Sequence, residues 1–136
     1  MRDDLNAVFF NNVADLVNTY GLNKSQVATF LKISRPTVDA WIKREPRTIR
    51  NENRMNVTCL VAACNEHINI RYQNLLGQLL YRKHSSVTKE LMGLADHDFQ
   101  NAEKMNAIAI EINIRLAGLH RSNRLSSALA DQKPLI

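Results

Sequence analysis

The sequence predicts an all-α protein, and three observations support this. The 136 residues include only 4 glycines and 3 prolines, so few tight turns are forced on the chain. Apolar residues make up 45%, which is enough for a packed core and too many for a disordered chain. Apolar side chains recur at spacings of three and four along most segments, which is the helical period. A chain of this length is expected to form one domain, or a small domain with an appended helical extension.

Three helices are expected in the N-terminal third. Gly21 marks the end of the first, as a glycine just past a helix often does. Asn23 and Ser34 precede the second and third, and their side-chain oxygens can accept a free N–H from the first turn. Pro36 fits the first turn of the third helix, where a missing N–H costs nothing. The expected helices cover about 4–19, 24–31 and 35–44.

The remaining residues are also expected to be mainly helical. Pro46 disfavours the helical conformation of Glu45, the residue before it, so "EPRTIRNEN" is expected to be a loop. Ser85 and Ser86 can open a short helix, and a polar tail after Arg121 is expected to fray. The expected helices cover 53–84 with a break near Asn65, 87–95, and 98–121.

Residues 108–116 also fit a β-strand. Apolar and polar side chains alternate there, and "INIR" recurs at 68–71, so two strands could pair. We expect helix, because "NAEKMNA" precedes the segment and no Asn-Gly or Asp-Gly turn lies nearby.

Such a helix is apolar around most of its circumference and would be buried on more than one side. We expect one stripe to pack against a partner subunit, with packing inside the monomer as the alternative. The stripe consists of Met105, Ile108, Ile112, Leu116 and Leu119.

The positive charge is concentrated in one window. The net charge is +5, and residues 32–54 hold seven basic against three acidic side chains. Such a window fits a nucleic-acid surface or a solvated arginine-rich loop. Cys59 and Cys64 lack metal-site spacing and are expected to be half-buried apolar residues. No apolar run is long enough for a membrane span and no signal peptide is evident, so a cytoplasmic protein is expected.

The segment "LNKSQVATFLKISRPTVDAWIK" satisfies the packing needs of two short helices joined by a tight turn. Ala28 supplies a small residue where the helices would cross. Apolar residues that would face one core follow at spacings of 4, 2, 5 and 3, and they are Val27, Leu31, Ile33, Val38 and Trp41. Trp41 is therefore expected in the core and not stacked on a base.

This segment resembles the helix-turn-helix of the lambda-repressor and Cro-like (XRE-type) DNA-binding domains, over residues 5–70 only. Lys32 stands where that family commonly has a glycine with positive φ, so a slightly rebuilt turn is expected. The resemblance implies a four- or five-helix DNA-binding domain at 1–70. Since such proteins usually bind DNA as dimers, the apolar helices that follow are expected to form a helical oligomerisation region at 71–136.

The resemblance also implies which residues meet DNA. The helix after Ser34 would enter the major groove, where Arg35 can donate two hydrogen bonds to guanine. Asp39 can accept from cytosine, orient Arg35, or only favour the positive end of the helix dipole. Residues expected to read bases are Arg35, Pro36, Thr37, Asp39 and Ala40. Residues expected to bind phosphates are Asn23, Lys24, Gln26, Ser34, Lys43, Arg44 and Arg47, with Arg50 and Arg54 as further possibilities.

The function these features imply is that of a sequence-specific, double-stranded DNA-binding transcriptional regulator of a phage, prophage, plasmid or bacterium. It would bind a palindromic operator as a homodimer or tetramer and associate with the nucleoid. The alternative is a protein-interaction module, an antirepressor or adaptor, whose helix-turn-helix does not bind DNA.

An enzyme is not expected. The four histidines lack metal-ligand spacing, and no phosphate loop or nucleophile motif occurs. "ADHDF" groups Asp96, His97 and Asp98, but three adjacent residues cannot all face one ion, and a helix cap is expected instead. No cofactor, metal, membrane or small-molecule ligand is expected.

Overall fold

The computed structural model of the chain describes residues 2–45, 48–81 and 85–131, and all secondary structure in these ranges is helical, as the sequence predicts. Two short 3₁₀ segments, η1 and η2, supplement seven α-helices in the described ranges. Their bounds are α1 (Arg2–Asn18), α2 (Lys24–Leu31), α3 (Arg35–Ile42), α4 (Asn51–His67), η1 (Gln73–Leu75), α5 (Leu76–Tyr81), α6 (Ser86–Met92), η2 (Asp96–Gln100) and α7 (Ala102–Asp131).

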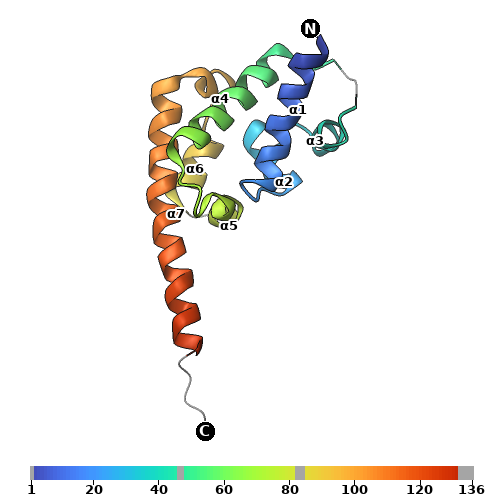
Figure 1. Cartoon of the computed structure of the whole chain (residues 1–136). Helices are drawn as coiled ribbons and strands as arrows, with labels where there is room; N and C mark the ends of the chain where they lie inside the picture. Colours follow the sequence, from blue (N-terminus) through green and yellow to red (C-terminus); the bar gives the residue numbers. More distant parts are fainter. Residues whose placement is uncertain (1, 46–47, 82–84, 132–136) are drawn as a thin grey trace.

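Helix α4 lies at the centre of the arrangement. It packs against α1 on one side and against α7 and η2 on the other (Figure 1). Helices α1, α2 and α3 form one end of the molecule, and α7 runs along the opposite edge. The last part of α7 continues beyond the other helices, so it has solvent around it.

One hydrophobic cluster runs through both predicted parts of the chain. It begins at Phe9 in α1, passes through Leu60 in α4 and reaches Leu119 in α7. The predicted division at residue 70 therefore does not separate two cores. The long predicted helix over 53–84 is interrupted later than Asn65, because α4 ends at His67 and an irregular turn leads into η1.

Helix caps occur where the sequence predicts them. Gly21 has φ +70°, a left-handed conformation that suits glycine at the end of a helix. Asn23 Oδ1 accepts a 2.8 Å hydrogen bond from the N–H of Gln26 at the start of α2. Ser85 Oγ accepts from the N–H of Thr88 at 3.1 Å and begins α6.

The turn between α2 and α3 keeps a left-handed residue without a glycine. Lys32 has φ 57° and ψ 45°, and its N–H donates to the carbonyl of Ala28. The expected rebuilding of the turn does not occur, because the lysine itself adopts the positive φ. Its side chain leaves the turn and Nζ donates to the carbonyl of Leu94, beyond the end of α6.

A close backbone approach joins α5 to the turn between α1 and α2. The N–H of Gly77 donates to the carbonyl of Tyr20 at 3.1 Å. A Cβ placed on Gly77 would lie 1.9 Å from the carbonyl oxygen of Gly21, so residue 77 has to be glycine for this contact. Gln26 Nε2 donates to the carbonyl of Gly77 at 2.9 Å and extends the contact to α2.

Helix α7 confirms the helical interpretation of residues 108–116 and corrects two other expectations. The helix continues to Asp131, so the chain does not fray directly after Arg121. The stripe assigned to a partner subunit is instead buried inside the monomer, against α4, α5, α6 and the two 3₁₀ segments. Each of Met105, Ile108, Ile112, Leu116 and Leu119 is at most 7% exposed, so none is available for an oligomer interface. The alternative, packing within the monomer, is the one observed.

Candidate nucleic-acid interface

Helices α2 and α3 are held together by the apolar side chains that the sequence singles out. Val27 and Leu31 of α2 and Val38 of α3 are buried, and Ile33 of the turn packs against the same cluster. Trp41 is 3% exposed and its ring meets that of Phe9 edge-on, with centroids 4.9 Å apart and planes at 83°. The tryptophan is therefore a core residue, as expected, and it anchors one side of α3.

The opposite side of α3 faces solvent. Arg35, Pro36 and Lys43 are exposed and Asp39 is half-buried, and their spacings of three and four place them on one helical face. We call this face the α3 outer face. Helix α3 is amphipathic, and this is the side of it that the described residues leave open to solvent. It presents two cationic side chains, one acidic group and a proline ring.

Ser34 sets the direction of the first turn of α3. Its Oγ accepts a 3.3 Å hydrogen bond from the N–H of Thr37 and lies 2.7 Å from Thr37 Oγ1. Pro36 occupies the first turn, where it leaves no unsatisfied N–H. Thr37 is half-buried and its hydroxyl is engaged by the cap, so less of it is available to a ligand than the sequence suggests.

Arg35 projects from the first turn of α3 beside the start of α2. Its Nη1 donates a 3.3 Å hydrogen bond to Ser25 Oγ, and the side chain is exposed. Ser25 is not among the predicted site residues, because nothing local in the sequence connects it to a residue ten positions later. One long hydrogen bond orients the guanidinium and leaves its other N–H groups free to bind a ligand.

Asp39 pairs with Lys24 across the two helices. Lys24 Nζ lies 2.8 Å from Asp39 Oδ1, and both side chains are more than one third exposed. The hydrogen bond from Lys24, with the charges of Lys24, Arg35 and Lys43, holds the pKa of Asp39 below its ordinary value. The carboxylate is thus ionised at neutral pH, and its direct partner is Lys24 and not Arg35.

Ala40 does not belong to the α3 outer face, which corrects its assignment as a base-reading residue. Its side chain is only 3% exposed. The chain leaving α3 closes against this part of the helix, since the N–H of Glu45 donates to the carbonyl of Ala40 at 3.0 Å. A thymine methyl could not reach the buried side chain, and Lys43 takes the next place along the exposed stripe.

Asn23 and Gln26 are largely used inside the protein. Each side chain accepts a hydrogen bond from the backbone N–H of the other, which completes a capping box. The amide nitrogen of Gln26 also donates to Gly77. These contacts use most of the polar atoms that Asn23 and Gln26 were expected to offer to phosphates, so little of their hydrogen-bonding capacity remains for DNA.

The basic residues that follow α3 differ in their environments. Lys43 is exposed, while Arg44 has φ 57° and its Nη2 donates to Asn11 Oδ1 at 2.7 Å. Arg54 donates to Asn6 Oδ1 and lies 5.7 Å from the centre of the Phe9 ring, so it is a structural residue. Arg50 is exposed. The predicted phosphate contact at Arg47 lies outside the described residues.

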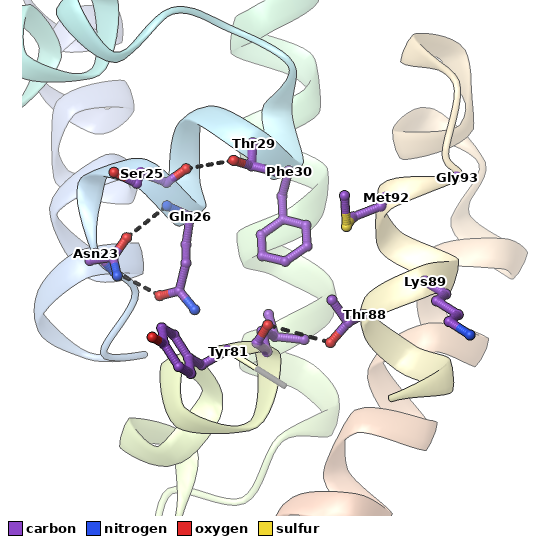
Figure 2. A pocket seen from close by; sticks show the side chains of 11 residues that line it. Asn23, Ser25, Gln26, Thr29, Phe30, Tyr81, Thr88, Lys89, Met92 and Gly93 are labelled. Carbon is purple, nitrogen blue, oxygen red and sulfur yellow. Dashed lines mark hydrogen bonds between the residues drawn. The ribbon is translucent and has the colours of Figure 1, made fainter. Parts of the chain in front are cut away.

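A groove adjoins the start of α2, between this helix and α6. Figure 2 shows Gln26 and Phe30 of α2, with the capping residue Asn23, on one wall and Thr88 and Met92 of α6 on the other. Its volume is about 700 Å³. Tyr81 and Met92 at its rim are 75% and 50% exposed, so the groove opens to solvent.

The described residues do not form a metal site, and the other residues considered from the sequence have structural roles. Within them, no three His, Cys, Asp or Glu side chains lie close enough to hold a metal ion. Asp98 caps η2 by accepting from the N–H of Ala95 at 2.8 Å, as expected for "ADHDF". Cys59 and Cys64 are free thiols, the first half-buried and the second buried.

Comparison with known proteins identifies no relative: no family model, curated protein sequence or solved structure matches the chain. Among the described helices, none combines the length and the apolar character needed to cross a lipid bilayer. The chemistry of the α3 outer face and its surroundings is therefore the basis for assigning a function.

Proposed function

We propose that the chain is a sequence-specific double-stranded DNA-binding protein that regulates transcription, with α2 and α3 as its helix-turn-helix. The observation that carries the proposal is the division of α3 into two faces. Trp41 and Val38 anchor one face in the core, while the other presents Arg35 and Lys43 to solvent. A helix fixed in this way can enter a major groove without rearranging.

Arg35 would select the sequence. It is the first residue of α3, and the long hydrogen bond that it donates to Ser25 orients it. A guanidinium suits the O6 and N7 acceptors of guanine. Pro36 would contact an adjacent base edge. Asp39 would act indirectly, because it holds Lys24 and contributes negative charge near the arginine.

Phosphates would be bound by the residues around this face. Lys43 and Arg50 are exposed cations of the basic window, and Arg44 lies between them in the sequence, with one N–H group donated to Asn11. The N-terminal N–H groups of α2 and α3 would add the positive ends of two helix dipoles. Such contacts position a protein on DNA and make its affinity depend on salt.

The first experiment is selection of bound duplexes from a random library with the full chain. An enriched sequence, and a palindrome if two copies bind together, is expected. No enrichment, combined with no retention of any duplex at low salt, would refute DNA binding and leave the adaptor function as the alternative.

Two substitutions then separate base reading from phosphate binding. Arg35→Ala is expected to cost about 1–3 kcal/mol of binding and to relax preference at one base position. Lys43→Ala should weaken binding to all sequences similarly and reduce the salt dependence by about one phosphate contact. Arg71→Ala, an exposed arginine in the turn after α4, is the matched control and should change neither.

A further inference from the structure

The face of α7 that points away from the body is apolar and uncovered. Ile110 and Ile114 are 47% and 59% exposed, although both are large aliphatic residues in the middle of a 30-residue helix. Ala107 and Ala117 extend the same stripe at either side, the first exposed and the second half-buried. The face opposite this stripe carries the residues that are buried against the body, and the described residues leave the two isoleucines of the stripe exposed.

Charged residues close the stripe at both ends. Glu103 lies four positions before Ala107, and Arg121 lies four positions after Ala117. Both are exposed, and within the described part of the chain neither side chain has a hydrogen bond or an ion pair. The six positions Glu103, Ala107, Ile110, Ile114, Ala117 and Arg121 alternate spacings of four and three, which is the heptad pattern of a helix that pairs with another helix.

We propose that two copies of this chain associate through this face, with their α7 helices side by side and antiparallel. The six positions are symmetric about residue 112. A two-fold axis beside that residue therefore places Ile110 against Ile114 of the second copy, and Ala107 against its Ala117. Each contact occurs twice, as a two-fold interface requires.

The charges determine the orientation. In the antiparallel pair, Glu103 of each copy meets Arg121 of the other, which forms an ion pair at both ends of the apolar contact. A parallel pair would set Glu103 against Glu103 and Arg121 against Arg121, and like charges placed together are destabilising. The alanines next to these ends are small enough to let the two helices approach closely around the isoleucines.

This interface differs from the one the sequence predicts, which uses the stripe now found in the core. It does not depend on DNA binding, since self-association and DNA affinity are measured separately. A monomer that binds DNA would refute only the interface, and a dimer that binds no DNA would refute only the proposed function.

The first test is the molar mass of the full chain in solution, from light scattering or sedimentation equilibrium over a range of concentrations. A reversible dimer in the micromolar range is expected. A monomer at all concentrations up to the solubility limit would overturn the proposal.

Charge reversal tests the pairing. Arg121→Glu is expected to weaken the dimer by about tenfold or more, because two ion pairs become two repulsive contacts. The double variant E103R/R121E restores opposite charges and should recover the dimer. Arg71→Glu makes the same chemical change at an exposed residue of the turn after α4, outside α7, so it should have little effect. Loss of the dimer in R71E as well, or no rescue in the double variant, would contradict the arrangement.

Cysteine cross-linking tests the direction. In an antiparallel pair, the two copies of residue 107 are separated by about 15 Å along the helix axis, too far for a disulfide. A107C and A117C chains should therefore not cross-link alone but should cross-link when mixed, with the wild-type chain as the control for Cys59 and Cys64. Cross-linking of A107C with itself would establish a parallel pair and refute the proposal.

Discussion

Lys32 Nζ donates a hydrogen bond to the main-chain carbonyl of Leu94, which connects the turn between α2 and α3 to the segment that follows α6. The same lysine has the left-handed backbone conformation, with φ 57°. One residue thus combines a conformation that glycine adopts more readily with a side-chain contact that glycine cannot make. The position of α3 therefore depends on the C-terminal half of the chain. Three interactions connect them: this hydrogen bond, the one from Gln26 to Gly77, and the shared hydrophobic core.

Substitutions of Lys32 should separate these two contributions. Lys32→Ala loses the bond to Leu94 and keeps the strained backbone, so it should reduce the free energy of unfolding by about 1 kcal/mol. Lys32→Gly also loses the bond but removes the Cβ penalty, worth about 1 kcal/mol at positive φ, and should be the more stable of the two variants. Urea unfolding measures both. If alanine were as stable as glycine at this position, residue 32 would not have a left-handed backbone.

Gly77 and Gly118 should respond in opposite directions to alanine. A Cβ at residue 77 would meet the Gly21 carbonyl oxygen at 1.9 Å, so Gly77→Ala should destabilise the protein by about 2 kcal/mol or more. A Cβ at residue 118 would meet nothing within 4 Å, so Gly118→Ala should stabilise α7 by about 0.5–1 kcal/mol. Urea unfolding at a single protein concentration would measure both changes in the free energy of unfolding. A neutral Gly77→Ala variant would contradict the packing of α5 against the turn before α2.

The two thiols should differ in reactivity. Burial raises the pKa of Cys64 to about 12, so almost no thiolate forms at this residue near neutral pH. Cys59 is half-buried and reachable from solvent. Iodoacetamide at pH 8 should modify one thiol in the native protein and two in urea, as counted by mass spectrometry. Rapid modification of both native thiols would show that α4 does not bury Cys64.

Asp98 should make stability depend on pH in acid. The N–H of Ala95, and then Lys104, stabilise its carboxylate and lower its pKa from the ordinary value of 3.8. A lowered pKa in the folded state means that the ionised group contributes stability above about pH 4, and that this contribution is lost as pH falls through the folded value. The free energy of unfolding in urea should therefore fall more steeply between pH 5 and pH 2 for the wild type than for Asp98→Asn. Parallel curves of this free energy against pH would show that Asp98 does not cause the acid sensitivity.

Sequence reasoning succeeds where structure is decided by neighbours in the chain. The caps at Asn23, Ser34 and Ser85 are predicted correctly, because a capping side chain bonds to an N–H three residues away. The core positions Val38 and Trp41 follow from helical spacing, since one face of a short helix has to be buried. The helical state of residues 108–116 follows from their flanking sequence.

Longer-range features could not be predicted. The helix that became α7 has two apolar stripes, and periodicity does not say which of them the body covers; the stripe containing Ile112 is buried, and that containing Ile114 is exposed. Ala40 is buried, and its spacing from Arg35 does not reveal this. The bond from Gln26 to Gly77 joins residues 51 positions apart, so a side chain expected on DNA is partly used to hold α5.

A single core from Phe9 to Leu119 limits how this protein can be divided. Recombination at residue 70 would separate α4 from α7, and each fragment would expose apolar surface that the other now covers. Swapping either half with that of another protein should give insoluble chimaeras unless the contacts of α4 are transferred too. Any new domain is better attached after α7, because residues 121–129 of this helix are all exposed.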